Sequence, residues 1–282
     1  MSDKISICGM AKNEDCYIEE WVNHYLALGV NHIFIYDNND SPSKVMKSLE
    51  CDQVTIIPVN GFETLKQLGY QSGAYIKCYR QHSQEYGWMG FFDIDEFFTI
   101  NTVKPDNTSY TIGELLSLPK FNDADVLHTN WRYYGDNDLI YNDGRGVKER
   151  FINPAPIDVR YAQQFPENRH VKSFIRTNKP FVEINCHTGF YPNCVCKHID
   201  GYNTDAYSCF NNYSYGTAQV SHYGTKTITE FIARKILNMH RASCGLLNNP
   251  EDRIKWFFNV NSHTPEKDAI ANKVLEQWRK VH

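Results

Sequence analysis

Three acidic residues at the end of an apolar run are the strongest chemical signal in the sequence. The segment Trp88–Phe98 has the sequence WMGFFDIDEFF, which places Asp93, Asp95 and Glu96 after bulky apolar residues. Such a run predicts a buried β-strand over Trp88–Asp95 that delivers carboxylates at its end. Because side chains alternate along a strand, Asp93 and Asp95 are expected on one side, where they could hold Mg²⁺ or Mn²⁺. The alternative is that these acids only end a strand and begin a turn.

Composition narrows the class of protein. The chain has 282 residues, which suffice for one large α/β domain or for a domain with an attached lobe. Its formal net charge of −4 gives no general attraction for a polyanion, so no nucleic acid partner is expected. Aromatic residues make up 14% of the chain, which favours sites that stack bases or sugars, although aromatic residues also fill cores.

Neither end of the chain nor its interior shows a membrane signal. The first residues, MSDKISICGMAKNED, are polar where a signal peptide would be apolar, and no apolar run approaches the length of a membrane span. We therefore expect a cytoplasmic protein. A helix carrying Trp256, Phe257 and Phe258 could make a peripheral contact with the inner face of the membrane, and core packing explains these residues equally well.

The nine cysteines are scattered and show no paired CxxC spacing. Cys186, Cys194 and Cys196 together with His198 resemble a zinc cluster superficially, but a C-x-C-x-H spacing is atypical of structural zinc. A chain of this size needs no disulfides for stability, so reduced thiols are expected.

The first hundred residues alternate between strand and helix patterns. Strands are expected at Ile5–Cys8, His32–Tyr36 and Val54–Val59, and helices at Asp15–Leu28, Ser43–Leu49 and Leu65–Tyr86. This alternation predicts an open α/β sheet with a nucleotide-sized crevice at the carboxyl ends of its strands. Neither GxGxxG after the first strand nor GxxxxGK[ST] occurs, so the dinucleotide fingerprint and the P-loop are excluded.

The rest of the chain is expected to add strands and then helices. The strands are predicted at Asp125–Tyr134, Val171–Arg176, Phe181–His187 and Gln219–Tyr223, and the helices at Thr111–Leu118, Thr227–Met239, Asp252–Phe258 and Glu266–Val281. The glycine- and charge-rich segment Asp143–Arg150 is interpreted as a mobile loop over a cleft.

Four segments, in this order, carry a resemblance that covers most of the chain: KNEDCYIEEWVNHYLALGVNHIFIYDN, WMGFFDIDEFF, WRYYG followed by VKERF, and HYGTKTITEFIARKI. With these motifs the chain resembles the inverting glycosyltransferases of families 2 and 92. The resemblance implies an α/β protein of the GT-A (Rossmann-like) fold, a mixed sheet flanked by helices with a helical C-terminal region. It also implies metal-dependent transfer of a hexose from a UDP-sugar to a glycan or lipid-linked glycan acceptor, in surface polysaccharide synthesis.

The resemblance suggests how the chain is divided. Residues 1–100 would form the nucleotide-sugar-binding half, residues 101–225 the acceptor side and the rest of the sheet, and residues 226–282 a helical region, all within one compact domain. On the first loop, Ala11, Asn13 and Glu14 match the positions that hold uridine in such enzymes, as does Asp37 after the second strand. Asn13 could instead cap a helix, and Asp37 could form a turn.

A metal site follows from the same resemblance. Asp93 would face the ribose or the metal, and Asp95 would coordinate Mn²⁺ or Mg²⁺, which neutralises the departing diphosphate. His222 is the first choice for a third ligand and His187 the second, because imidazole suits Mn²⁺.

Several further residues are assigned to the donor and to the chemistry. Lys172, Arg176 and Lys226 could contact the diphosphate. Inversion also needs a carboxylate that deprotonates the acceptor hydroxyl. Asp136 is the expected base, with Glu149 as runner-up; the remaining acids that could serve are Asp138 and Glu96.

Two other classes of function stay open at this point. A nucleotidyltransferase or pyrophosphorylase also uses paired aspartates at a strand end, but it should show a glycine-rich basic loop after the first strand. The corresponding segment here, GMAKNED, has one glycine and one lysine. A non-catalytic carbohydrate-binding protein would need neither the acid pair nor the nucleotide crevice.

Overall fold

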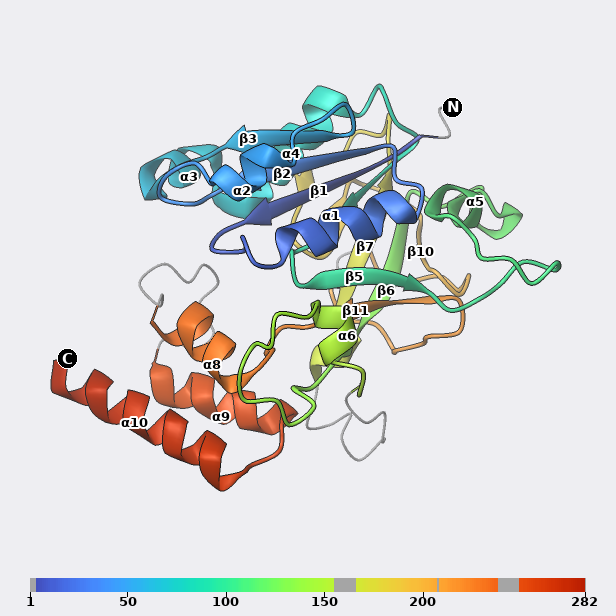
Figure 1. The fold of residues 1–282 in the computed structure, drawn as a ribbon. Coiled ribbons are helices and arrows are strands. Elements are labelled where there is room, and N and C mark those ends of the chain that lie inside the picture. Colours follow the sequence, from blue (N-terminus) through green and yellow to red (C-terminus); the bar gives the residue numbers. More distant parts are fainter. Residues whose placement is uncertain (1–3, 155–165, 207, 238–248, 282) are drawn as a thin grey trace. The chain divides into compact units, whose positions relative to one another are not determined.

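The chain forms two compact units, each built from two stretches of sequence. The computed structural model describes residues 4–154, 166–206, 208–237 and 249–281 (Figure 1). The first unit comprises Met1–Arg132 and Ala162–Ser221, and the second comprises Tyr133–Tyr161 and His222–His282. The three-part division expected from the sequence follows the chain and stays a prediction.

A mixed β-sheet is the framework of the first unit (Figure 1). Its strands in the described chain are β1 Ile5–Ala11, β2 His32–Asp37, β3 Val54–Pro58, β4 Trp88–Phe91, β5 Glu96–Ile100, β6 Val126–Tyr133, β7 Val171–Arg176, β10 Cys196–His198 and β11 Ala218–His222. Their order is β3-β2-β1-β4-β7-β6-β11-β5, with β10 beside β6. A separate hairpin pairs β8 (Glu183–Ile184) with β9 (Gly189–Phe190), so the strand expected over Phe181–His187 is much shorter than predicted.

Parallel pairing brings several strand ends to one edge of this sheet. Strand β1 lies parallel to β2 on one side and to β4 on the other, with Ala11 opposite Asp37 and Cys8 opposite Phe91. Strands β4 and β7 are antiparallel, so the start of β7 lies at the carboxyl end of β4. The predicted α/β class, a mixed sheet flanked by helices, is confirmed.

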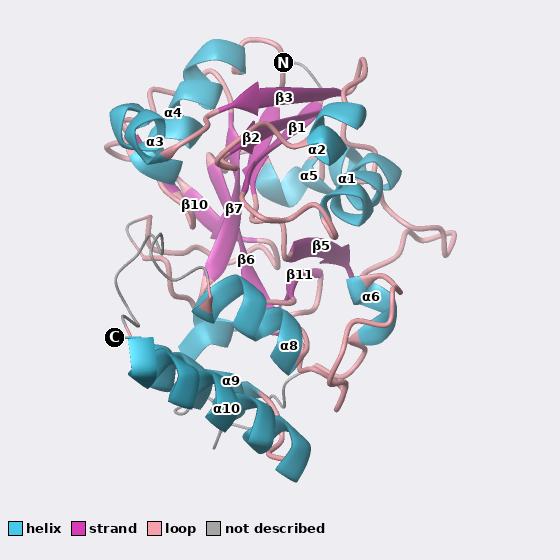
Figure 2. Ribbon diagram, turned by 60° about the vertical axis from the view of Figure 1, so that its left-hand side comes forward, coloured by secondary structure: helices cyan, strands magenta, loops and turns pink. Residues whose placement is uncertain are grey.

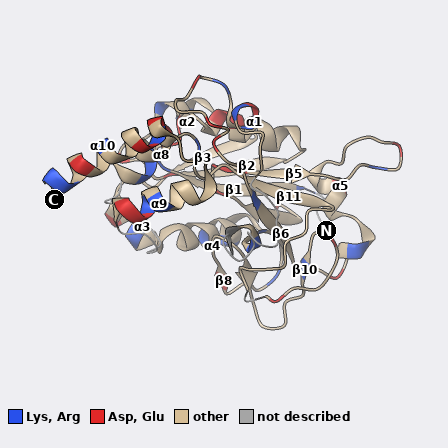
Figure 3. Cartoon of the chain, turned by 90° about the horizontal axis from the view of Figure 1, so that it is seen from below, with Lys and Arg blue, Asp and Glu red and all other residues tan. Residues whose placement is uncertain are grey.

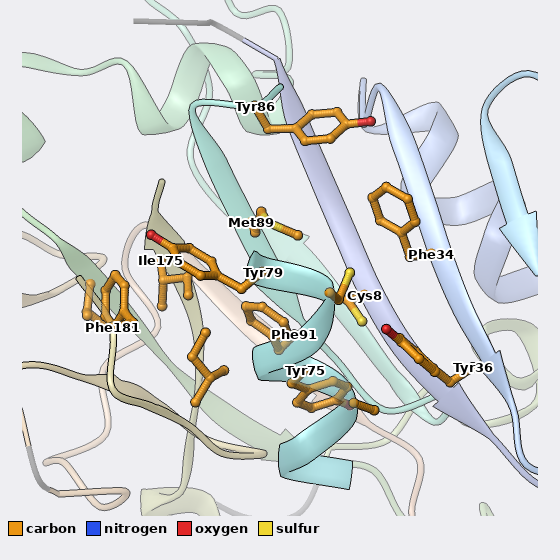
Figure 4. Packing of buried hydrophobic residues seen from close by; sticks show 14 of the residues in the cluster. Cys8, Phe34, Tyr36, Tyr75, Tyr79, Tyr86, Met89, Phe91, Ile175 and Phe181 are labelled. Atoms are coloured by element: carbon orange, nitrogen blue, oxygen red, sulfur yellow. The ribbon is translucent and has the colours of Figure 1, made fainter. Parts of the chain in front are cut away.

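Helices cover both faces of the parallel strands. In the first unit they are α1 Ile18–Ala27, α2 Lys44–Ser48, α3 Phe62–Leu68, α4 Tyr70–His82 and α5 Ile112–Leu116, with 3₁₀ turns η1 Pro119–Phe121 and η2 Pro166–Arg169. Neighbouring residues of β1 show the two faces. A Cβ atom at Gly9 would come within 3.0 Å of Trp21 in α1, whereas Cys8 packs with Cys78 of α4. The α4 side also carries Tyr75 and Tyr79, which cover Phe91 and Ile175 (Figure 4).

The single helix expected over Leu65–Tyr86 is wrong, because the chain breaks it into α3 and α4. Gly69 has φ +84° and Tyr70 has φ 60°, so the backbone turns left-handed between the two helices. A Cβ atom at Gly73 would lie 1.7 Å from the carbonyl oxygen of Leu68. Only glycine fits there, and the close approach directs α4 toward the sheet.

The second unit is mainly helical (Figure 2). It contains α6 Val147–Arg150, α8 Ile228–Phe231, the π-helical turn η3 Ile232–Ile236, α9 Pro250–Val260 and α10 Pro265–Val281. The helix predicted through Met239 thus changes to π geometry after Phe231, and residue 239 lies outside the described residues. The predicted loop over Asp143–Arg150 is wrong in its second half, because α6 is helical. The guanidinium of Arg150 is buried and donates to both carboxylate oxygens of Glu230, at 2.8 and 2.9 Å.

The aromatic residues of α9 pack within their own unit. Phe257 is fully buried against Phe231, and Trp256 and Phe258 are partly buried in the same apolar cluster, so core packing accounts for much of this aromatic group. Along α10, acidic and basic residues are interspersed (Figure 3). Among the helices that the structure describes, none is both long enough and apolar enough to cross a membrane.

Cysteines in the described ranges are free thiols. The closest approach that could suggest a cluster is between Cys194 and Cys196, whose sulfur atoms lie 3.7 Å apart. His198 is turned to another partner, since its Nε2 lies 2.9 Å from the Asn130 side-chain oxygen.

The buried His128 of β6 contacts the turn between β8 and β9 and the loop after β10. His128 is fully buried, and its two ring nitrogens lie 2.9 Å from the Thr204 hydroxyl and 2.8 Å from the Thr188 hydroxyl. Burial, together with the charge of nearby His198, lowers the pKa of His128 to about 3. Burial also lowers the pKa of His198 to about 4, against the opposing effect of Asp200. Both rings are therefore neutral in the native protein at pH 7.

These histidines predict a loss of stability in mild acid. In the unfolded chain a histidine binds its proton below about pH 6.5, whereas His128 and His198 resist protonation in the native state. The contribution of these histidines to the free energy of unfolding is therefore fully present above that pH. It falls as the pH is lowered, by roughly 1.4 kcal/mol per pH unit for each histidine. Urea unfolding at pH 7.0 and 5.5 measures the fall. His128→Asn should reduce this fall in stability, whereas His263→Asn, at an exposed histidine, should not. An equal fall in the two variants would contradict the assignment of the pH dependence to His128.

Candidate active site

The acids after β4 lie in a turn rather than in a strand. Strand β4 ends at Phe91, and the N–H of Glu96 donates to the carbonyl of Asp93 at 3.0 Å before β5 begins. The predicted strand over Trp88–Asp95 is therefore wrong beyond Phe91, and strand alternation does not set the directions of Asp93 and Asp95. We call Asp93–Glu96 the acid turn. Its position at the carboxyl end of a parallel strand is as the sequence predicts.

Two aromatic residues of α1 hold the backbone of the acid turn. Trp21 lies on the buried stripe of the helix, and its indole N–H lies 3.0 Å from the carbonyl oxygens of both Asp93 and Glu96. Tyr25, one turn later, donates its hydroxyl to the carbonyl of Glu96 at 3.1 Å. The turn is thus fixed through its backbone, which leaves its side chains available for other contacts.

A buried lysine lies against the acid turn. Lys172 of β7 is fully buried, with its ammonium 2.7 Å from Asp93 Oδ2 and 3.0 Å from Glu96 Oε2. Gln71 of α4 donates to the other oxygen of Asp93 at 2.6 Å. Glu96 is itself fully buried and also accepts the backbone N–H of Asp93 at 2.9 Å. Glu96, a candidate base in the sequence, therefore closes the turn, and Lys172, a candidate diphosphate contact, is its counter-ion.

The two acids that share the Lys172 ammonium have pKa values shifted in opposite directions. Burial alone would raise the pKa of Asp93, but the charge of Lys172 holds it below its usual value. Burial raises the pKa of Glu96 well above its usual value, despite the same lysine. The two acids together raise the pKa of Lys172, although burial opposes this. Asp93, whose side chain is 34% exposed, is therefore the member of the pair that stays ionised toward solvent.

Asp93 retains lone pairs that could bind a divalent cation together with a substrate, and Asp95 is buried in the same turn. A carboxylate has about four lone-pair sites, and the bonds from Gln71 and Lys172 occupy only one on each oxygen of Asp93. Within residues 4–154, 166–206, 208–237 and 249–281, no group of three or more His, Cys, Asp or Glu side chains is arranged to hold a metal ion. Mg²⁺ is commonly bound by one or two carboxylates plus substrate phosphates, which this pair could provide.

The two histidines considered as a third ligand belong to different units. His187 is in the first unit, where its Nδ1 lies 2.9 Å from the carbonyl oxygen of Val171. Burial, followed by the charge of Lys172, lowers the pKa of His187 to about 3, so the ring is neutral. His222 is in the second unit, buried with its ring 4.5 Å from that of Tyr133. Either role as a ligand stays a prediction.

The predicted uridine-binding residues lie at the carboxyl ends of β1 and β2. Ala11 and Asp37 are opposite each other in the last register pair of these strands. Asp37 is buried, and its carboxylate accepts the N–H groups of Asn39 at 3.0 Å and Ser43 at 2.8 Å. The turn-forming interpretation of Asp37 is thus confirmed.

The loop after β1 has a less usual geometry. Asn13 has φ 57°, and its N–H donates to the side chain of Asn39 at 2.8 Å, which joins the two loops. The alternative that Asn13 caps the helix is wrong, because α1 begins at Ile18 and its N-cap is Tyr17. The carbonyl of Glu14 accepts the N–H groups of Tyr17 and Ile18, both at 2.9 Å.

Candidate bases occur in the second unit in contrasting environments. Asp136 is buried and lies 2.8 Å from the ammonium of the fully buried Lys267. Burial raises the pKa of Asp136, and Lys267 opposes the shift. Asp138 is exposed and lies 3.2 Å from the same ammonium. Glu149 is exposed on α6, 3.5 Å from Arg145.

The other two residues predicted to contact the diphosphate, Lys226 and Arg176, donate to backbone carbonyls. Lys226 is buried in the second unit and donates to the carbonyl of Tyr223 at 3.2 Å. Arg176 donates to the carbonyls of Ala124 at 2.7 Å and Phe121 at 2.9 Å.

Sequence reasoning missed the residues that orient the acid turn. Both Trp21 and Tyr25 lie within the helix predicted over Asp15–Leu28, and each carries a polar tip that needs a hydrogen-bond partner when buried. Gln71 gave no signal, because its contact with Asp93 depends on where α4 turns back onto the sheet.

Removal of the buried ammonium should destabilise the protein strongly. Lys172→Met leaves two carboxylates without their counter-ion and should lower the free energy of unfolding by roughly 3 kcal/mol, the low end for a broken buried pair because Asp93 is partly exposed. Urea unfolding measures the loss. The control is Lys12→Met, which breaks the exposed pair with Asp40 at 3.1 Å and should cost less than about 1 kcal/mol. Equal losses in the two variants would show that Lys172 is not a structural counter-ion.

Comparison with known proteins places the chain in a family. The model of glycosyltransferase family 92 matches residues 4–203. A family 92 protein of Ricinus communis is 31% identical over 97 residues, which is 34% of this chain and 16% of that protein. One of Arabidopsis thaliana is 27% identical over 159 residues, 51% of this chain and 25% of that protein. The matches therefore span a quarter or less of these relatives' lengths.

Likeness to solved structures is weak. Mannosyl-3-phosphoglycerate synthase from Rubrobacter xylanophilus overlaps with a TM-score of 0.28 at 13% identity, over 50% of this chain and 43% of that one. Galactosyltransferase LgtC overlaps with a TM-score of 0.25 at 14% identity, over 44% of this chain and 46% of that one. These overlaps are too low to support an assignment, which depends on the family match over more than half of the sequence. By that match, the chain belongs to glycosyltransferase family 92.

Proposed function

We propose that the protein transfers a hexose from a UDP-sugar to a glycan or lipid-linked glycan acceptor, with inversion and with a divalent cation at the acid turn. Family membership supports glycosyl transfer. The observation that carries the finer proposal is the acid turn itself, whose two aspartates follow a parallel strand and whose Asp93 pairs with a buried ammonium. In this proposal the enzyme works in the cytoplasm, on acceptors presented at the inner face of the membrane for surface polysaccharide synthesis.

Sheet topology supports the place of the nucleotide. Ligands of open α/β sheets bind beyond the carboxyl ends of strands where the order reverses, and here β1 lies between β2 and β4. Uridine would then lie over the loops that follow Ala11 and Asp37, and the diphosphate over the acid turn. The GT-A fold and the inverting mechanism are the parts of this proposal that come from resemblance.

The chain's own residues would prepare this site for a charged leaving group. Asp93 and Asp95 would hold the cation, which when bound neutralises charge that develops on the diphosphate. Lys172 keeps Asp93 ionised, and Trp21 fixes the turn through its carbonyls. Since these groups are in place before substrate binds, little reorganisation is needed during the reaction.

Asp136 is proposed as the base that deprotonates the acceptor, with Glu149 as the alternative. Burial raises the pKa of Asp136, the direction that suits a general base working near neutral pH. Glu149 is largely exposed, with 63% of its side chain accessible, and it lies 3.5 Å from Arg145.

Metal-dependent nucleotide binding tests the site. Calorimetric titration of UDP with Mn²⁺ should show binding that chelator abolishes. Asp95→Asn should weaken it by about tenfold or more, because a neutral amide replaces a cation ligand. Asp106→Asn, at an exposed loop aspartate, is the matched control and should bind as the unaltered protein does. Unchanged affinity in Asp95→Asn would remove the acid turn from the donor site.

Acceptor chemistry tests the base. With a UDP-sugar that supports turnover, NMR of the product should show an anomeric configuration opposite to that of the donor. Asp136→Asn should lower kcat by about 10²- to 10⁴-fold, the usual contribution of a general base, with little change in UDP affinity. Glu149→Gln should retain most activity. The reverse pattern would assign the base to Glu149, and retention of configuration would refute the inverting proposal.

A further inference from the structure

An aromatic cluster lies beside the acid turn within the first unit. The rings of Trp131 and His170 stack with centroids 4.7 Å apart, and His187 lies 5.3 Å from Trp131 and 5.0 Å from His170. Phe210 completes the cluster, with its ring 4.1 Å from that of His170. We call these four residues the aromatic platform.

Backbone contacts fix the platform, and its outer part faces solvent. The backbone N–H of Trp131 donates to the carbonyl of His170 at 2.9 Å, and His170 forms an isolated β-bridge with Phe210. The exposed fraction of the residue is 9% at Trp131 and 40% at Phe210. A large ring held rigidly at the surface against other rings is available for stacking.

The platform and the acid turn share one edge of the sheet. Strand β7 starts at the carboxyl end of β4, and Asn130 at the carboxyl part of β6 is opposite Val171. Lys172 connects the two sites directly: its ammonium lies 2.7 Å from Asp93 Oδ2 and 6.0 Å from the ring centre of Trp131. The acid turn and the floor of the platform are therefore no farther apart than these two distances end to end, and they lie on either side of the same buried ammonium.

We propose that His170 and Phe210, supported by Trp131 and His187, bind a pyranose ring of the acceptor glycan. The inference rests on the proposed function and adds the chemistry of its acceptor subsite. One face of a pyranose consists of C–H groups, which pack on flat aromatic rings, while its hydroxyl groups stay at the wet rim.

Strand order favours the acceptor over the nucleotide base as the occupant. In the order β3-β2-β1-β4-β7-β6, the loops proposed for uridine follow β1 and β2 and the acid turn follows β4. The platform has Trp131 on β6 and His170 directly before β7. A donor that extends from β1 to the acid turn would thus point its sugar toward the platform. The ring that stacks on the platform would then be a sugar of the acceptor.

Binding of simple glycosides tests the platform. Saturation-transfer NMR with the methyl glycosides of glucose, galactose, mannose and N-acetylglucosamine, in the presence of UDP and Mn²⁺, should show contact with the sugar C–H face for at least one of them. Phe210→Ala and His170→Ala should weaken that binding about three- to tenfold, the range for loss of one aromatic contact. Phe210→Tyr, which keeps the ring, should retain it. Phe62→Ala, at another exposed phenylalanine of the same unit, is the control.

The outcomes separate this inference from the function on which it rests. Binding that survives both alanine variants, or no signal from any glycoside in the unaltered protein, overturns the platform while metal-dependent UDP binding still supports the transferase. Conversely, glycoside binding that depends on Phe210 in a protein that binds no UDP upholds the platform and rejects the transferase. Thermal unfolding of each variant shows whether it is folded. If Phe210→Ala is not folded, glycoside binding by Phe210→Tyr decides whether the platform binds the sugar.

Discussion

The ion pair of Lys172 with the acid turn is the interaction on which the rest of the site depends. Two carboxylates confined in one turn repel each other, and burial of both would be costly without an opposite charge. The ammonium of Lys172 lies within 3.0 Å of each, so it lets Asp93 stay ionised and accounts for the burial of Glu96. Since Lys172 comes from β7, the antiparallel pairing of β7 with β4 is a requirement of the site as well as of the fold.

Helix α1 supplies the second constraint. Trp21 and Tyr25 are apolar enough to pack on the sheet, and their polar tips reach the carbonyls of the acid turn. A Cβ atom at Gly9 would meet both the Trp21 ring at 3.0 Å and the carbonyl oxygen of Phe92 at 3.1 Å. A glycine in β1 is therefore needed for the helix and the turn to approach the strand together. Packing and orientation of the site are achieved by the same few residues.

The sequence allows the local parts of this arrangement to be predicted but not the contacts between distant segments. Alternation of strand and helix patterns gave the α/β class, and an apolar run before DIDE placed the acids at a strand end. The same run hid where β4 stops, because Phe92 and Ile94 are as apolar as the strand residues before them. The role of Lys172 depends on β-pairing between segments 79 residues apart, for which a single sequence carries no periodic signal. For Asp37, the dense turn-forming sequence after β2 did contain the answer.

The charge balance of the site bears on how the proposed cation would bind. Asp93 and Glu96 share one ammonium, Asp95 lies in the same turn, and Glu96 tends toward its neutral form because burial raises its pKa. The remaining excess of negative charge is small, and the described residues offer no three-ligand site that would hold a metal ion alone. A cation would therefore gain much of its affinity from the phosphates of the donor, and by linkage the donor would gain the same free energy from the cation. Such mutual dependence would leave the acid turn weakly occupied until the nucleotide sugar arrives, so that donor and metal bind as one unit.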